Sequence, residues 1–234
     1  NQPGAGWRSM LAGLEQALEL RLLALTSPLG EHAAELRFED LFNIEEVQKI
    51  QDAFSSATGV AAIITRPDGT PITRPSNFCH LCEHIIRKTE KGCANCYHSD
   101  AILGKANPNG PVLQPCLSGG LWDGGAGISV GDRHIANWLI GQVLDESADH
   151  ERMMRYCREI GADEAKYAEA LVQVPRMSKK KFETICEALY LIARQLSNLA
   201  FQNVQQAQHI TERKRTEEAL QQSRDALEIR VMER

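Results

Sequence analysis

Four of the seven cysteines in this 234-residue chain form two pairs with the same internal spacing. Cys79 and Cys82 make one C-x2-C pair, Cys93 and Cys96 make the second, and ten residues separate the pairs. Two cysteines with two residues between them lie on one side of a helical turn or knuckle, so each pair can present two thiolates to one point. The spacing predicts a tetrahedral site for zinc or an Fe–S cluster, with Cys116 as a possible fifth ligand.

Other interpretations of these cysteines are open. Free cysteine is often a small buried hydrophobic residue, and a C-x2-C pair can also be a redox dithiol. A thiol-redox enzyme is the less favoured interpretation, because the sequence lacks a thioredoxin-like βαβ pattern and a convincing acid or base partner. In a structural zinc-binding dimerisation scaffold, the same thiolates would stabilise folding and sense nothing.

The segment before the cysteines predicts a helix and a hairpin. Ile44–Ala57 has apolar residues at helical spacing, and Gly59 follows as a stop signal. Val60–Thr65 is a short β-rich run. After a turn signal at residues 67–69, Pro71–Arg74 is expected to form the return strand of a hairpin.

The cysteine-rich segment 78–100 predicts two short helices, separated around Gly92, with one C-x2-C pair near the start of each. The chain then returns to strands. These are expected at Val112–Leu117, Gly127–Val130 and His134–Leu144, and the last two are joined as a hairpin.

Regular alternation along the strand 134–144 predicts which side chains share a face. One face then carries the polar and aromatic mixture typical of a small-molecule pocket: His134, Ala136, Trp138, Ile140 and Gln142. The glycine-rich stretch 116–130 adds Trp122 and Asp123 for stacking and hydrogen bonding. We therefore expect a ligand to be bound by Trp122, Asp123, His134, Trp138 and Gln142.

Three separated motifs resemble the PocR-type sensory domain, a variant of the PAS-like fold that serves as an input module of bacterial regulators. They are PSNFCHLCEHIIRKTEKGCANCYHSD, then GLWDGGAGI shortly after a cysteine, then NWLIGQV, and the resemblance covers Leu41–Leu199. It implies an α+β fold, with an antiparallel sheet flanked by helices and a cavity for a small hydrocarbon derivative such as a diol. The contributors that it implies are the paired cysteines, Cys116, Trp122, Asp123, Trp138 and Gln142.

The C-terminal third predicts a long helix that forms a homodimeric coiled coil. An a/d register continues without a phase break through Phe182, Ile185, Leu189, Ile192, Leu196, Leu199, Asn203, Gln206, Ile210, Arg213, Glu217, Leu220, Arg224, Leu227 and Val231. Four of the five positions from Asn203 to Glu217 are polar or charged, so the middle of this seam is expected to be weak. The alternative is a long surface helix with charged faces.

The remaining sequence completes the predicted domain organisation. Trp7–Thr26 has the leucine and alanine spacing of a helix, which Pro28 then breaks. We expect an N-terminal helix and linker over residues 1–40, a sensory domain over 41–177 and a signalling and dimerisation helix over 178–234. Residues 210–234 resemble the connector that joins PAS-type sensors to histidine kinases or other output modules.

Composition narrows the classes of protein. A net charge of -5 argues against a nucleic-acid groove, which needs basic side chains to neutralise phosphates. The sequence has neither an apolar run of the roughly 18 residues needed for a membrane span nor a signal-peptide pattern, and it predicts a cytoplasmic location. We predict a sensory module with no catalytic centre of its own. It would belong to an intact two-component signal-transduction protein, such as a sensor histidine kinase or a related regulator.

Overall fold

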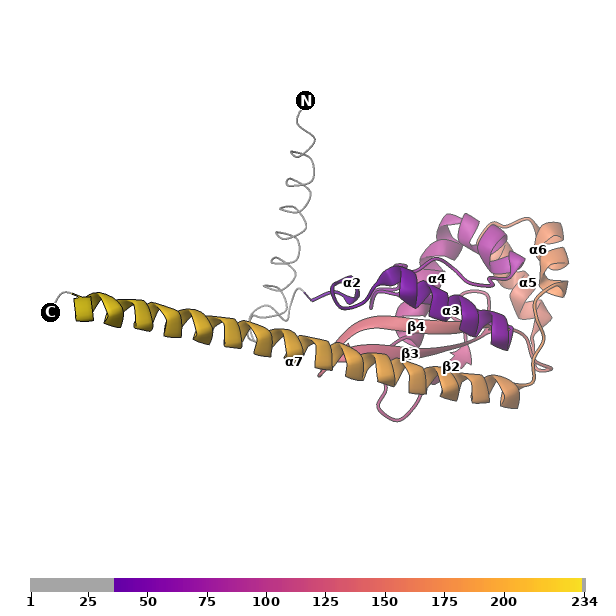
Figure 1. Ribbon diagram of the computed structural model, residues 1–234. Coiled ribbons are helices and arrows are strands. Elements are labelled where there is room, and N and C mark those ends of the chain that lie inside the picture. Colours follow the sequence, from indigo (N-terminus) through magenta and orange to yellow (C-terminus); the bar gives the residue numbers. More distant parts are fainter. Residues whose placement is uncertain (1–35, 233–234) are drawn as a thin grey trace, which may run out of the picture. The chain divides into compact units, whose positions relative to one another are not determined.

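The computed structural model describes residues 36–232, whose helices and strands run from α2 to α7 (Figure 1). Within them two compact units are distinguished. One unit is Phe42–Ala200, which contains the whole sheet. The described part of the other comprises residues 36–41 and 201–232.

The centre of the unit Phe42–Ala200 is a four-stranded antiparallel sheet with the strand order β1-β4-β3-β2. Its strands are β1 (Ala61–Thr65), β2 (Val112–Pro115), β3 (Trp122–Val130) and β4 (Arg133–Val143). A tight hairpin joins β3 to β4, with Val130 paired to Arg133. The structure confirms the predicted α+β class, with an antiparallel sheet, flanking helices and a long C-terminal helix.

One face of the sheet packs against α3 (Ile44–Thr58) and the first part of α7 (Lys179–Met232), as Figure 1 shows. The rings of Phe54 on α3 and Trp138 on β4 have centroids 6.1 Å apart. The backbone N–H of Ser129 on β3 donates to the hydroxyl of Ser197 on α7 at 3.0 Å. Trp138 is completely buried, so its indole belongs to the core on this face.

The opposite face packs against α4 (Glu90–Leu103) and a smaller helical layer. That layer consists of η2 (Leu81–Ile85), η3 (Ile86–Lys88), α5 (His150–Glu159) and α6 (Glu164–Val172). The core between this layer and the sheet includes Ile63, Leu81, Leu103, Leu139 and Tyr167.

The predicted helix before β1 is confirmed, and the predicted return segment does run back beside β1 but forms isolated bridges in place of a strand. The helix α3 ends at Gly59, whose φ of 76° is the left-handed conformation typical of a helix stop. The segment returns antiparallel beside one edge of β1, with isolated bridges from Thr65 to Pro71 and from Ala62 to Ser76, but residues 71–74 form no continuous strand. The other edge of β1 pairs with β4. Prolines at positions 71 and 75 supply no N–H at either end of this segment. The hydroxyl of Thr73 accepts the N–H of Ile64 in place of a backbone carbonyl.

The cysteine-rich segment forms helical pieces with one cysteine pair near the start of each, as predicted. The break falls at Thr89 rather than around Gly92. The reason is a capping hydrogen bond: the hydroxyl of Thr89 accepts the N–H of Gly92 at 3.0 Å, so Gly92 belongs to the first turn of α4.

The long helix α7 is continuous over 54 residues, but part of its predicted seam packs within the chain. Phe182, Leu189 and Leu196 are buried in this single chain. The same buried stripe includes Cys186, Ala193 and Ala200. These seam positions therefore stabilise the domain's own core, and the prediction that they form an intermolecular seam needs this correction.

The second unit contains α2 (Phe38–Leu41) and the C-terminal part of α7. Its buried side chains include Phe38, Val204 and Ala207. The predicted helix Trp7–Thr26 lies outside the described residues. Between residues 36 and 232, no helix combines the length and the apolar character that crossing a bilayer requires.

Candidate functional site

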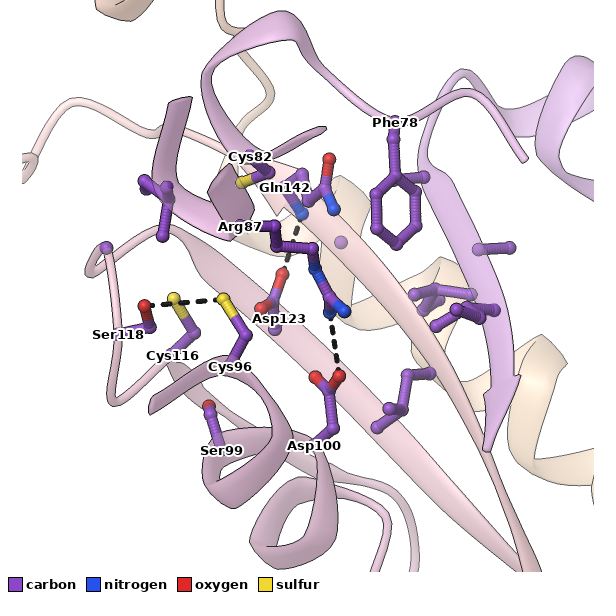
Figure 2. A pocket seen from close by; sticks show the side chains of 18 residues that line it. Phe78, Cys82, Arg87, Cys96, Ser99, Asp100, Cys116, Ser118, Asp123 and Gln142 are labelled. Carbon is purple, nitrogen blue, oxygen red and sulfur yellow. Dashed lines mark hydrogen bonds and ion pairs between the residues drawn. The ribbon is translucent and has the colours of Figure 1, made fainter. Parts of the chain in front are cut away.

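A small pocket lies between the sheet and the helical layer that carries the cysteine pairs (Figure 2). It offers about 40 Å³ of space to water-sized groups, which suits a molecule of a few non-hydrogen atoms. Its lining side chains include Ile63, Phe78, Cys82, Ile86, Arg87, Cys96, Ser99, Asp100, Cys116, Ser118, Asp123, Leu139 and Gln142.

A β-bulge turns Gln142 into this pocket. Trp122 pairs with Val143 and Asp123 pairs with Gly141, so Gln142 is an extra residue on β4. Gln142 has a φ of 60°, which is uncommon for a residue other than glycine. The amide oxygen of its side chain accepts the backbone N–H of Cys79 at 2.8 Å. The bulge therefore ties β4 to the first cysteine pair.

Gly141 makes this bulge possible. Its φ of 151° disfavours other residues, and a Cβ at this position would lie 2.2 Å from Oδ1 of Asp123. With no side chain at Gly141, Oδ1 of Asp123 accepts the backbone N–H of Gln142 at 2.7 Å. Asp123 and Gln142 thus meet at one point of the pocket wall, as Figure 2 shows.

Asp123 is poised to change its charge near neutral pH. Burial raises the pKa of its carboxyl to about 7, although the hydrogen bond from the N–H of Gln142 opposes this rise. The neighbouring thiol of Cys116 also opposes the rise in the pKa of this carboxyl. Below neutral pH, the protonated carboxyl can donate a hydrogen bond to a ligand as well as accept one.

Arg87 and Asp100 form an ion pair on the other side of the pocket, with Nη2 and Oδ2 2.8 Å apart. The guanidinium also lies over the rings of Phe78 and Tyr97, at 5.3 and 5.8 Å from their centroids. Burial raises the pKa of Asp100, while Arg87 acts in the opposite direction. Nε of Arg87 is buried without a hydrogen-bond partner among the described residues, so it is a donor that a ligand can satisfy.

Three of the five cysteines predicted as metal ligands line the pocket, and the other two have different surroundings. Cys82, Cys96 and Cys116 are the lining thiols. The Sγ of Cys96 donates to the hydroxyl of Ser118 at 3.4 Å, and the Sγ of Cys116 accepts the N–H of Gly120 at 3.2 Å. Cys79 lies beside Cys82, whose thiol lowers the pKa of Cys79, whereas Cys93 lies beside Tyr97 and raises the pKa of that phenol.

The described residues show no preformed metal centre. Within residues 36–232, no group of three or more His, Cys, Asp or Glu side chains is placed to hold a metal ion. Burial raises the pKa of the thiols of Cys96 and Cys116, which favours the neutral thiol over the thiolate that zinc or an Fe–S cluster needs. Zinc or Fe–S ligation by the five cysteines stays a prediction from their spacing.

The other predicted ligand residues separate into two groups. Asp123 and Gln142 line the pocket, whereas Trp138 packs on α3 at the opposite face of the sheet. Trp122 lies beneath Nζ of Lys179, which is 5.0 Å from its ring centroid. His134 is half-buried and bonds through Nε2 to the carbonyl of Ala136 at 2.9 Å. The bulge explains the separation of Trp138 from Gln142, because it breaks the alternation along β4.

Arg87, Asp100, Phe78 and Ser118 are pocket residues that the sequence interpretation did not identify. Helical spacing could have identified Asp100, because Asp100 lies four residues after Cys96 and therefore on the same side of α4. An aspartate on a buried helix side needs a partner, and Arg87 is that partner. No sequence pattern indicated the pairing itself, which spans the break between η3 and α4.

The fold and the site together define an α+β domain with a small, partly polar pocket between its sheet and one helical layer. The family described as "Sensory domain found in PocR" matches residues 40–201, which is more than half of the chain. The chain belongs to this family and is accordingly a sensory input module. Comparisons with curated proteins and with solved structures gave no match.

Proposed function

We propose that the pocket binds a small neutral molecule with hydroxyl groups, such as a diol, and that the domain reports its presence. The observation that carries this proposal is the juxtaposition of the Asp123–Gln142 bulge with the unpartnered Nε of Arg87 in one small cavity. These groups can both donate to and accept from hydroxyls. Ile63, Phe78 and Leu139 supply apolar surface for a short carbon chain.

Charge balance in the pocket supports a neutral ligand over an anion. The positive charge of Arg87 is already matched by Asp100 at 2.8 Å. Ionised Asp123 would repel an anion, and protonated Asp123 offers it no counter-charge. A carboxylate ligand would therefore lose its hydration without gaining an unpaired cation.

The binding test compares 1,2-propanediol with lactate, in which a carboxylate replaces one alcohol group. Isothermal titration calorimetry of the full chain should give saturable binding of the diol and at least about tenfold weaker binding of lactate, which is at least about 1.4 kcal/mol. Gln142→Asn should weaken diol binding, since asparagine tolerates positive φ but its shorter side chain cannot reach the N–H of Cys79. The matched control is Gln173→Asn at an exposed position outside the pocket.

Two results would count against this proposal. One is lactate binding as tightly as the diol, and the other is Gln173→Asn weakening the diol as much as Gln142→Asn does. Absence of saturable heat with 1,2-propanediol, glycerol and ethanediol would exclude small polyols as the ligand class.

We further propose that the ligand signal reaches α7 through β3. Asp123 lies in the pocket, and the next residue, Gly124, faces Cys186 of α7 so closely that a Cβ on Gly124 would be 2.5 Å from its Sγ. Successive residues of a strand point to opposite faces, so a shift of Asp123 displaces the surface on which α7 packs. Ligand binding would then favour one of two packings of α7 on the sheet.

The output of this signal is proposed to be a homodimeric coiled coil formed by the later part of α7. Seam positions Leu220, Leu227 and Val231 are exposed in the single chain, at 63%, 57% and 74%. Arg213 and Glu217, also on the seam, pair with each other at 3.1 Å between Nε and Oε1. Such an exposed pair contributes little stability, and it leaves the middle of the seam free to change its register.

A further inference from the structure

The pocket shares one wall with a second, larger cavity. This outer groove has a volume of about 390 Å³ and is lined by residues of α4, α5 and the loop 116–121 that connects β2 to β3. Ser118 and Gly119 line both the groove and the pocket. At these two residues, a single loop therefore separates the pocket from the groove.

This loop has a fixed base and a glycine-containing tip. At the base, Pro115 pairs with Trp122, and the backbone N–H of Cys116 donates to the carbonyl of Leu121 at 2.7 Å. At the tip, Gly120 has a φ of 79°, a conformation that glycine adopts without strain. The tip can therefore move about Gly120 while the base keeps its hydrogen bonds.

One hydrogen bond from a tyrosine fastens the tip to the helical layer. The hydroxyl of Tyr156 on α5 accepts the side-chain N–H of Asn95 on α4 at 3.1 Å and shares a hydrogen bond of 2.6 Å with the hydroxyl of Ser118. Because Asn95 occupies the phenol as an acceptor, the phenol hydrogen is available to Ser118. The start of the loop is held separately, since the N–H of Leu117 donates to the hydroxyl of Ser99 at 3.0 Å.

The opposite end of the pocket is closed by stronger contacts. Figure 2 shows Phe78 toward this end and Ser118 toward the other. The guanidinium of Arg87 lies 5.3 Å from the ring centroid of Phe78 and pairs with Asp100 at 2.8 Å. Opening that end would separate two buried charges, whereas moving the tip of the loop breaks a hydrogen bond between two neutral hydroxyls. The loop is therefore the favoured place for an entrance.

We propose that residues 117–120 form an entrance loop that opens the pocket to the outer groove, and that the Ser118–Tyr156 hydrogen bond holds this loop closed. When the bond breaks, Ser118 and Gly119 swing away from the pocket and a small neutral molecule passes from the groove into it. The inference rests on the proposed function, because it names the entrance to the same pocket.

The test measures access to the pocket without any ligand. Cys116 lines the pocket and is 6% exposed, so its alkylation by iodoacetamide, followed by peptide mass spectrometry of the reduced full chain, reports opening. Tyr156→Phe should accelerate this alkylation at least about threefold, as the loss of one hydrogen bond implies. The matched control is Tyr190→Phe, which removes a hydroxyl that donates to the carbonyl of Pro108 at 2.9 Å and should leave the rate unchanged.

Two further measurements separate opening of the loop from other effects. Cys186 is buried against β3, so its alkylation reports unfolding of the domain and should keep its wild-type rate in Tyr156→Phe. Ser118→Ala removes the same hydrogen bond from the other side. Combining it with Tyr156→Phe should therefore give no more acceleration than the faster of the two single variants. Tyr156→Phe alone decides the matter if Ser118→Ala does not fold.

The proposal is overturned if Tyr156→Phe leaves the alkylation of Cys116 unchanged, or accelerates Cys116 and Cys186 equally. It is also overturned if Phe78→Leu accelerates Cys116 and Tyr156→Phe does not, since the entrance then lies at the opposite end of the pocket. The experiment contains no diol. Accelerated alkylation without diol binding would therefore refute the proposed ligand class and leave the entrance loop standing, and diol binding with unchanged alkylation would do the reverse.

Discussion

At the scale of single residues, the site depends on polar groups that burial forces into specific pairings. Asp123 accepts the N–H of Gln142, and Arg87 pairs with Asp100 in the same cavity. Unpaired, each of these groups would cost several kcal/mol in a dry interior, on the order of the penalties for buried charges. The sequence identified Asp123 and Gln142, because both belong to polar positions within apolar strands. It did not identify Arg87, because charged residues in a helical segment usually face water.

Asp123 makes the stability of the domain depend on pH. Its pKa is about 7 in the folded chain against an ordinary value of 3.8, so between these values the folded state binds more protons than the unfolded state. The contribution of this residue therefore becomes less favourable as pH rises from about 4 to about 7, by up to about 4 kcal/mol. In urea unfolding at a series of pH values, Asp123→Asn should lose less stability over this window than the wild type.

The control for this effect is Asp132→Asn, because Asp132 is exposed in the β3–β4 turn. Its profile should follow the wild type. If Asp123→Asn has the same pH profile as the wild type, the carboxyl of Asp123 does not titrate near neutral pH.

At the scale of elements, the confirmed predictions rested on patterns within short stretches of sequence. Helix α3 has a regular apolar stripe and a glycine stop, and the β3–β4 hairpin has a glycine-containing turn. The failures involved tertiary contacts. Prolines 71 and 75 and the side chain of Thr73 reduce the return segment's pairing with β1 to isolated bridges. One bulge residue reverses the face on which Gln142 lies. No periodicity in a single sequence marks where such a bulge falls.

The contact between β3 and α7 predicts a measurable energetic coupling. Gly124→Ala places a Cβ 2.5 Å from the Sγ of Cys186, so this overpacking should cost about 1–3 kcal/mol of unfolding free energy. Removing that sulfur with Cys186→Ala should relieve most of the cost. Chemical denaturation of the two single variants and the double variant measures the coupling.

Cys157→Ala is the control background, since Cys157 is a buried cysteine on α5. In that background Gly124→Ala should retain its full cost. Equal costs of Gly124→Ala in the Cys186→Ala and Cys157→Ala backgrounds would mean that β3 and α7 are not coupled through this contact.

At the scale of the whole molecule, α7 has two different apolar surfaces along its length. Phe182, Leu189 and Leu196 are buried in the unit that contains the sheet, whereas Leu220 and Leu227 are exposed. The heptad pattern was continuous across both regions, so the sequence could predict the helix but could not separate packing within the chain from packing between chains. That distinction depends on which side of the helix the sheet covers.

The proposed dimer makes the exposed surface testable. Leu220→Asp combined with Leu227→Asp should raise the dimer dissociation constant at least about tenfold, because each dimer would bury charges without partners. Analytical ultracentrifugation over a range of concentrations measures this change. Gln222→Asp and Glu218→Asp, combined as the control, lie off the seam and should leave dimerisation unchanged. A wild-type chain that stays monomeric at all concentrations would contradict the proposed coiled coil.

The bulge at Gln142 also affects how the ligand specificity of such a domain can change. It divides β4 into a part whose side chains complete the core, including Trp138 against α3, and a position whose side chain is presented to the pocket. A substitution at Gln142 can therefore alter the choice of ligand while the core keeps its packing. Single substitutions at this position could in this way change the ligand specificity of the domain during evolution without changing its fold.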